Sequence, residues 1–137
     1  MCLDSRGDDP GDAVRIARQP WSDAYLSSRA IQRGYTYVVW RGPHVVEPTS
    51  LSAEQAAAYW AETLRVAAAL LQHFRPLKLN YMTLGNSVPH LHTHLVPRFE
   101  VDPNPGGPFP IVPAEDPGPI AEEQLTADVA RLRELLA

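Results

Sequence analysis

The pattern of apolar and polar positions predicts strands in four stretches of the chain. The strongest candidate is 35–41, which is almost entirely β-branched and aromatic and is flanked by turn residues on both sides. Residues 77–83 alternate apolar with polar side chains and predict a second strand. Two shorter strands are predicted at 13–17 and 23–26, where the pattern is weaker.

Two helices are predicted from apolar residues that recur at intervals of three and four. The longer one begins at Ser52, which can cap it, with Gln55 completing a capping box. Pro76 cannot extend a helix and disfavours helical geometry in the residue before it, so we expect this helix to end near His73. The shorter helix covers 125–136 and carries apolar residues on one face, namely Leu125, Val129, Leu132 and Leu136.

Three histidines at alternate positions, His90, His92 and His94, form the most distinctive pattern of the chain. Successive side chains of a strand point to opposite faces, so a strand here would place all three imidazoles on one face. The opposite face would carry Leu91, Thr93 and Leu95 and pack on a core. A helix would scatter the same imidazoles around its axis.

A tight turn is predicted just before the histidines, at Gly85-Asn86. Such a turn would pair the histidine strand antiparallel with 77–83, and it would bring Asn80 close to the imidazoles. The alternative for Asn80 is an ordinary amide at a turn or a sheet edge.

A row of imidazoles has three interpretations that the residues alone leave open. It can be a solvated polar face of a sheet. It can be a metal site, because histidine is the commonest transition-metal ligand; same-face neighbours on a strand lie about 6.5 Å apart, so two could share a zinc ion but three would be awkward. It can also hold a neutral imidazole that acts as a nucleophile, tuned by its neighbours.

The composition is that of one globular domain. The chain has 137 residues, of which 45% are hydrophobic and 20% charged, enough for a core of its own. We expect residues 1–11 to be mobile and residues 12–110 to form the domain. Residues 111–137 are expected to form a proline-rich linker followed by the short helix.

The charge and the N-terminus restrict the expected partners and location. A formal net charge of −4 argues against nucleic acid and anionic membranes, although a small anion could bind a locally positive site. We find neither an apolar signal segment nor a run approaching the ~20 apolar residues of a membrane span. The single cysteine, Cys2, excludes an intrachain disulfide and fits a reducing compartment, so we expect a cytoplasmic protein.

Residues 90–96, His-Leu-His-Thr-His-Leu-Val, match the signature of the histidine triad (HIT) family, with Thr93 the loosest position. The likeness extends over about 34–108, and the chain is similar to bacterial HIT proteins described as dinucleoside polyphosphate hydrolases. The resemblance implies an α+β HIT fold: a mainly antiparallel five-stranded sheet, one long helix packed on it and a short C-terminal helix. It also implies a homodimer. A proline- and glycine-rich arm at 103–110, similar to one in those sequences, is expected to wall the site or reach a partner subunit.

The resemblance also implies a reaction. His92 would be the nucleophile that attacks the α-phosphorus of a nucleotide, and His90 would supply the backbone carbonyl that orients it. His94 would hydrogen-bond a phosphate oxygen. The nucleotidyl-histidine would then be hydrolysed to a nucleoside monophosphate, so that a P–O–P or P–N (phosphoramidate) bond is cleaved. No metal is needed at the nucleophile, while Mg²⁺ can accompany a polyphosphate substrate.

Four further residues are candidates for binding the nucleotide and its phosphates. Asn86 and Ser87 offer an amide and a hydroxyl in the Gly85 turn, and Asn80 is expected nearby. Arg98 closes the motif, and it can pair either with a polyphosphate or with a carboxylate of the protein.

The sequence departs from the family pattern in three places. Tyr35 stands where many members have histidine, and Ser27 where many have the aspartate that holds the ribose, which puts nucleoside recognition in question. Family members often open with Cys-x-x-Cys, whose thiolates join two histidines on a structural zinc. Here the matching residues are Cys2-Leu3-Asp4-Ser5, so Ser5 stands in place of the second cysteine, and His44 would be the third ligand. A hydroxyl is a poor substitute for a thiolate, so we predict no structural zinc.

The alternatives to a nucleotide hydrolase are a non-catalytic nucleotide-binding HIT protein and a zinc-dependent hydrolase that uses two triad histidines.

Overall fold

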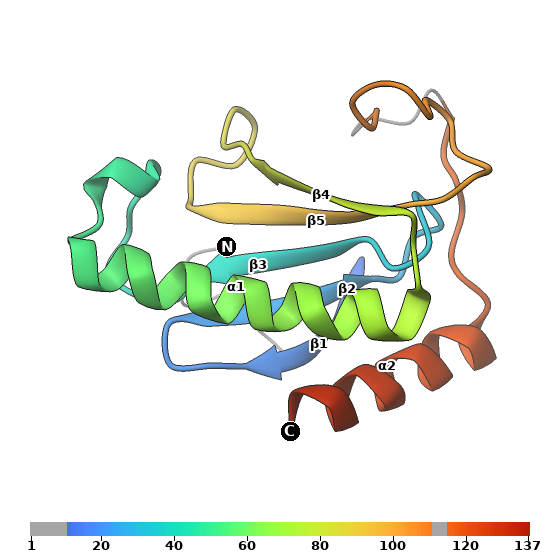
Figure 1. Cartoon of the computed structure of the whole chain (residues 1–137), viewed down its shortest axis with the longest axis horizontal. Coiled ribbons are helices and arrows are strands. Elements are labelled where there is room, and N and C mark those ends of the chain that lie inside the picture. The colour runs from blue at the N-terminus through green and yellow to red at the C-terminus, as the bar shows by residue number, and fades with distance from the viewer. Residues whose placement is uncertain (1–10, 111–114) are drawn as a thin grey trace.

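The computed structural model describes residues 11–110 and 115–137. At its centre lies a five-stranded sheet in the order β1-β2-β3-β5-β4, in which neighbouring strands are all antiparallel (Figure 1). The α+β architecture and the strands expected from the sequence are confirmed. The strands are β1 (Ala13–Arg18), β2 (Ser22–Ser27), β3 (Thr36–Trp40), β4 (Lys78–Thr83) and β5 (His92–Arg98).

The long helix α1 (Ala53–Phe74) begins as predicted and follows a single 3-10 turn, η2 (Pro48–Ser50). Ser52 Oγ accepts a hydrogen bond from the Gln55 backbone N–H at 3.2 Å, and Gln55 Oε1 accepts one from the Ser52 N–H at 2.9 Å. This is the predicted capping box. The helix ends at Phe74, and Arg75 then takes a left-handed conformation ahead of Pro76.

Helix α1 covers one face of the sheet and is joined to it by polar as well as apolar contacts. The Tyr59 hydroxyl donates to the Val38 carbonyl at 3.0 Å and lies 2.9 Å from Thr93 Oγ1. Thr93 Oγ1 also lies 2.9 Å from Thr83 Oγ1, and Thr93 is fully buried. Thr93, the polar residue at an apolar position of the histidine motif, therefore connects β5 to α1.

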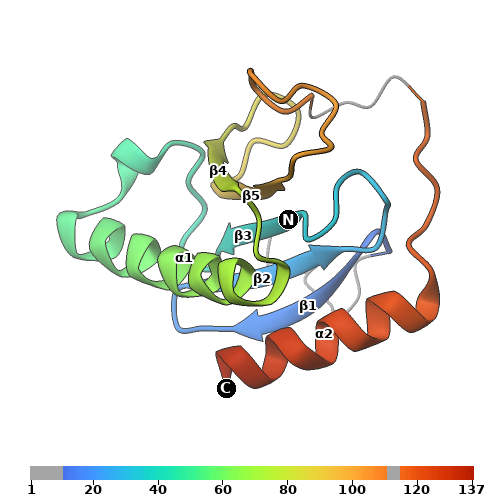
Figure 2. The same ribbon diagram turned by 45° about the vertical axis from the view of Figure 1, so that its right-hand side comes forward.

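Helix α2 (Glu122–Leu136) lies beside β1 and α1 and is packed into the same core (Figure 2). Val129, Leu132 and Leu136 are buried there, and His73 Nε2 on α1 lies 2.7 Å from Asp128 Oδ1 on α2. Among the residues described, no helix combines the length and apolar character that a membrane span requires. Residues 1–10 and 111–114, where the mobile terminus and part of the linker were expected, lie outside the described residues.

Two local predictions about the histidine segment are wrong. Strands β4 and β5 do pair antiparallel, with Thr83 opposite Thr93, but an eight-residue loop at 84–91 joins them instead of a tight turn at Gly85-Asn86. Strand β5 begins only at His92, so His90 is not part of it. The reason is Leu91, which is buried and hydrogen-bonded through its backbone to Trp40, the last residue of β3, and to Val45 beyond it. These hydrogen bonds keep Leu91 beside the end of β3, so the chain does not turn directly from β4 into β5 at Gly85-Asn86.

Candidate functional site

His92 and His94 lie on the face of the sheet opposite α1. They alternate along β5 with Thr93 and Leu95, which face the helix and the core. Within the sheet, Tyr37 on β3 and Met82 on β4 are the direct neighbours of His94. Both histidines are buried, with 4% of His92 and 7% of His94 exposed.

His90 contributes its backbone rather than its ring to this pair. Its carbonyl oxygen lies 2.7 Å from His92 Nδ1, while its ring Nε2 lies 2.8 Å from the Trp40 carbonyl and its Nδ1 lies 3.2 Å from His44 Nδ1. A carbonyl can only accept a hydrogen bond, so His92 Nδ1 donates. A neutral His92 therefore carries its lone pair on Nε2.

His94 lies where it can contact the lone pair of His92. The two Nε2 atoms are 3.1 Å apart, and the rings meet edge to face with centroids 4.8 Å apart. Burial, followed by the proximity of His92, lowers the pKa of His94 to about 4. His94 is thus neutral at pH 7 and has one N–H and one lone pair to offer.

Tyr35 is a member of this site that the sequence did not identify as such. Its hydroxyl lies 2.8 Å from His94 Nδ1, and its ring packs against those of Tyr37 and Phe109. Its departure from the histidine of family members bears, from the sequence, on nucleoside recognition; the structure places it behind the third triad histidine. The partners are 59 residues apart, so no local pattern could have indicated the contact.

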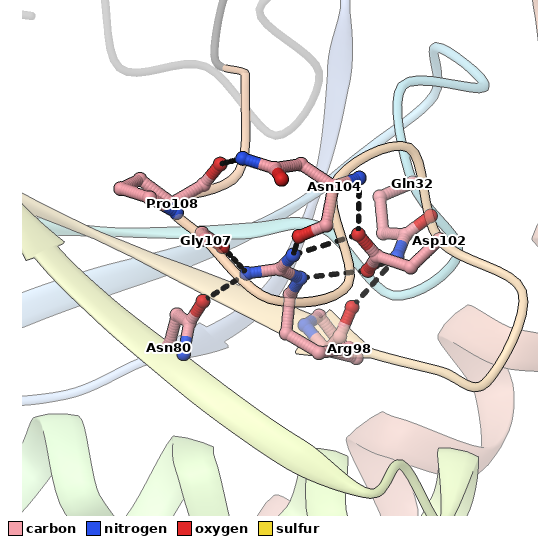
Figure 3. A network of polar contacts seen from close by, with 8 residues as sticks. Gln32, Asn80, Arg98, Asp102, Asn104, Gly107 and Pro108 are labelled. Carbon is pink, nitrogen blue, oxygen red and sulfur yellow. Dashed lines mark hydrogen bonds and ion pairs between the residues drawn. The ribbon is translucent and has the colours of Figure 1, made fainter.

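The guanidinium of Arg98 lies at the centre of a saturated network (Figure 3). Its Nε and Nη2 donate to the two Asp102 carboxylate oxygens at 2.6 and 2.7 Å, and Nη2 also reaches the Asn104 carbonyl at 2.5 Å. Its Nη1 donates to Asn80 Oδ1 at 2.5 Å and to the Gly107 carbonyl at 2.9 Å. All five N–H groups of the guanidinium are thus taken by the protein.

This network bears on the phosphate-binding role expected of Arg98 and Asn80. Of the two partners considered for Arg98, the structure has the carboxylate, and Asn80 serves as a further acceptor for the same guanidinium. Arg98 and backbone hydrogen bonds hold the pKa of Asp102 at about 2, so the pair is charged at neutral pH. The network fixes the 103–110 arm, which lies at the end of the β4–β5 pair opposite the 84–91 loop (Figure 1).

The arm ends in a contact that bears on the histidines. Phe109 is 4% exposed and packs with Tyr35 and Val96, and the Arg98 guanidinium lies 5.6 Å from the centroid of its ring. The expected ordered arm therefore walls the triad side of the sheet, with Phe109 as its contact. The sequence placed the arm but did not indicate which residue would reach the site.

The remaining candidates are dispersed. Asn86 and Ser87 are exposed on the 84–91 loop. Ser27, where family members have the ribose-binding aspartate, is buried, and its Oγ accepts a hydrogen bond from the Arg29 N–H at 3.1 Å. Among residues 11–110 and 115–137, no three His, Cys, Asp or Glu side chains gather to hold a metal ion. A zinc hydrolase built on two triad histidines would therefore lack a third protein ligand among the described residues.

Known structures share this arrangement of strands and helices. The chain is similar to a histidine triad protein from Bradyrhizobium japonicum, with a TM-score of 0.81 and 28% identity, covering 92% of each chain. A histidine triad protein from Sinorhizobium meliloti 1021 superposes with a TM-score of 0.80 and 29% identity, covering 91% of this chain and 90% of the other.

Sequence comparison gives the same family. The chain is 28% identical to Protein hit of Bacillus subtilis (strain 168) over 81 residues, which are 56% of this chain. The match spans 55% of that relative, so just over half of its length. The model of the HIT domain matches residues 11–101, which include all three triad histidines. With this match and the geometry of His92, the chain belongs to the HIT domain family.

Proposed function

We propose that this chain hydrolyses nucleotides at a phosphoanhydride or phosphoramidate bond, with His92 as the nucleophile. The observation that carries the proposal is the 2.7 Å hydrogen bond from His92 Nδ1 to the His90 carbonyl. It leaves the lone pair of a neutral imidazole on Nε2, which is what attack on phosphorus requires. Membership of the HIT family supports a nucleotide as the ligand.

The proposed cycle has two displacements. His92 Nε2 forms a bond to the α-phosphorus, and the bond from phosphorus to the leaving oxygen or nitrogen breaks. The leaving group keeps that electron pair and takes up a proton. Water then attacks the same phosphorus, the P–N bond to His92 breaks, and a nucleoside monophosphate and a proton are released. No metal is assigned to the attack itself; Mg²⁺ would accompany a polyphosphate substrate.

Donors for the phosphate oxygens come from two places in this proposal. His94 supplies its ring N–H beside the nucleophile, at the 3.1 Å spacing of the two Nε2 atoms. Asn86 and Ser87 would approach from the exposed loop. Asn80 and Arg98 are not included, because the Arg98 network engages them in holding the arm.

Replacing His92 by asparagine tests the proposal. Wild-type protein is expected to release AMP from adenosine phosphoramidate or from a diadenosine polyphosphate, and assaying both identifies the bond preferred. Asparagine has a similar reach but cannot be nucleotidylated, so His92→Asn should lose at least about 10³-fold in turnover while still binding nucleotide. His73→Asn, in the last turn of α1 where it contacts Asp128 of α2, is the control and should retain turnover. Equal rates for wild type and His92→Asn, with nucleotide still bound, would favour the non-catalytic alternative.

We also propose that the protein forms a homodimer through α1 and the free edge of β4. Strand β4 is an edge strand, and Tyr81 on it lies opposite Leu95, on the α1 side of the sheet. Tyr81 is 39% exposed, and on α1 the side chains of Leu64 and Leu71 are 54% and 41% exposed. Exposed apolar side chains on α1 and on β4, an edge strand of the sheet in the described residues, are suited to a second copy of the same chain.

The oligomeric state in solution tests this second proposal. The wild type is expected to sediment as a dimer, whereas Leu64→Glu combined with Leu71→Glu should give a folded monomer. Val101→Glu, a change at a 92% exposed position in the arm region, is the control and should remain dimeric. A monomeric wild type would contradict the proposal.

A further inference from the structure

We infer that Tyr35 is a positioning residue that fixes the tautomer of His94 and so keeps the His94 Nε2–H directed at the reacting phosphate. The inference rests on the proposed function, since it concerns the histidine expected to contact phosphate. Its basis is the 2.8 Å contact between the Tyr35 hydroxyl and His94 Nδ1, made by a tyrosine that is only 1% exposed.

The direction of every hydrogen bond in this group follows from one carbonyl. The His90 carbonyl can only accept, so His92 Nδ1 carries the hydrogen and a neutral His92 has its lone pair on Nε2. At 3.1 Å from that lone pair, His94 Nε2 must be the donor. His94 Nδ1 is then the acceptor, and the Tyr35 hydroxyl must donate to it.

Both partners are in the protonation state that this arrangement needs. Burial, and to a lesser extent the neighbouring Tyr37, raises the pKa of Tyr35, so its hydroxyl keeps its hydrogen at neutral pH. Burial and His92 lower the pKa of His94 to about 4, so His94 holds a single ring hydrogen. Where that hydrogen lies is therefore decided by the groups beside the two nitrogens.

The backbone and the arm hold Tyr35 in place. Gly34 has a φ of +81°, and a Cβ at this position would come within 2.7 Å of the Phe74 ring and 2.9 Å of Pro97, so only glycine fits the approach to Tyr35. The Tyr35 ring lies 5.2 Å from Tyr37 and 6.1 Å from Phe109, between centroids. Contacts with these two rings thus restrict the Tyr35 ring while its hydroxyl meets His94.

The consequence concerns the moment when substrate arrives. In the free protein the His94 Nε2–H is donated to the lone pair of His92. When that lone pair forms the bond to phosphorus, the N–H loses its acceptor and becomes available to a non-bridging oxygen, on which negative charge develops. Without the Tyr35 hydroxyl, His94 could move its hydrogen to Nδ1. It would then present a lone pair to the phosphate, which repels the developing charge.

Tyr35→Phe tests the inference, because it removes the hydroxyl and keeps the ring. Long-range proton–nitrogen NMR distinguishes a protonated from an unprotonated imidazole nitrogen and does not depend on turnover. In the free wild type, the lone pair of His92 also keeps the hydrogen of His94 on Nε2, so the tautomer is compared in the His92→Asn background, where that lone pair is removed. There His94 should still carry its hydrogen on Nε2, and adding Tyr35→Phe should move a substantial share to Nδ1. In the single variant Tyr35→Phe, turnover of the nucleotide that the wild type cleaves should fall about 10- to 100-fold. This loss is smaller than the loss in turnover caused by removing a donor to a transition-state oxygen outright. Tyr37→Phe, which alters the other tyrosine beside the His94 ring, is the matched control and should keep the Nε2–H tautomer.

The possible outcomes separate this inference from the proposed function. A wild-type His94 that carries its hydrogen on Nδ1 overturns the inference without any variant. So does a His94 tautomer that Tyr35→Phe leaves unchanged in the His92→Asn background, together with wild-type turnover of the single variant Tyr35→Phe. If the wild type cleaves no nucleotide, the proposed function fails while the tautomer measurement still decides the role of Tyr35. Thermal unfolding of Tyr35→Phe shows whether the variant is folded, and the wild-type spectrum provides a test if it is not.

Discussion

Arg98 and Asp102 are joined by two parallel hydrogen bonds, Nε to Oδ2 at 2.6 Å and Nη2 to Oδ1 at 2.7 Å. This two-pronged geometry is available to a guanidinium and not to an ammonium group. The same guanidinium binds the Asn104 and Gly107 carbonyls, so one side chain at the end of β5 ties the arm to the sheet.

Replacing Arg98 by lysine should therefore lower the stability of the fold. Lysine keeps the charge but cannot satisfy five acceptors, and the buried carboxylate would lose one of its two bonds. We expect a loss of about 1–3 kcal/mol in the free energy of unfolding, measured by urea denaturation. Arg131→Lys is the control, because Arg131 pairs with Glu134 in an exposed ion pair, and it should cost less than about 0.5 kcal/mol. Equal losses for the two variants would show that the arm network contributes nothing specific.

The choice that the sequence left open for Arg98 shows why part of the site could not be predicted. A carboxylate partner lies only four residues away, at Asp102, and is visible in the sequence. The other acceptors include the backbone carbonyls of Asn104 and Gly107, which any residue type provides. A pattern of side chains carries no information about such carbonyls, so the saturation of Arg98 appears only in three dimensions.

The elements of the fold were easier to predict than the connection that carries His90. Alternation along 77–83 and the capping box at Ser52 are local signals, and both were confirmed. The 84–91 loop depends on backbone hydrogen bonds from Leu91 to Val45 and Trp40, which lie more than forty residues away along the chain. The same separation hid the contact of Tyr35 with His94.

The lowered pKa of His94 predicts how stability depends on pH. The pKa is about 4 in the folded protein against an ordinary 6.5, so between these values the unfolded chain binds a proton that the folded protein does not. The contribution of neutral His94 is complete above pH 6.5 and declines as the pH falls towards about 4. His94→Gln removes the titrating group, so its thermal unfolding temperature should fall less than that of the wild type across this window. Parallel curves for the two proteins would contradict the prediction.

Thr93 should contribute to stability through its hydroxyl, although the family pattern has an apolar residue there. Because the Tyr59 hydroxyl donates to Val38, Thr93 donates to Tyr59 and accepts from Thr83. Thr93→Val keeps the β-branched shape and removes both bonds, so we expect a loss of about 1 kcal/mol in the free energy of unfolding. Thr83→Val, at an exposed position, leaves the Tyr59 bond intact and should cost less than half as much. A Thr93→Val protein as stable as the wild type would mean that the hydroxyl network adds nothing to packing.

The His44–His90 pair bears on whether the protein holds a structural zinc. The two Nδ1 atoms lie 3.2 Å apart, and the Trp40 carbonyl accepts from His90 Nε2, so the His90 Nδ1 lone pair faces His44. This would suit two ligands of a zinc ion, but a closed structural site needs four, and Cys2 and Ser5 lie outside the described residues.

The zinc prediction follows from the chemistry of Ser5, since a neutral hydroxyl cannot replace the second thiolate of Cys-x-x-Cys. Protein purified without chelators should contain well under one equivalent of zinc by elemental analysis. Ser5→Cys recreates the missing ligand and should bring the content close to one equivalent, with a higher unfolding temperature that EDTA reverses. Cys2→Ser in the Ser5→Cys background is the control and should lose the metal again. Stoichiometric zinc in the wild type would show that three ligands and a hydroxyl or water suffice here.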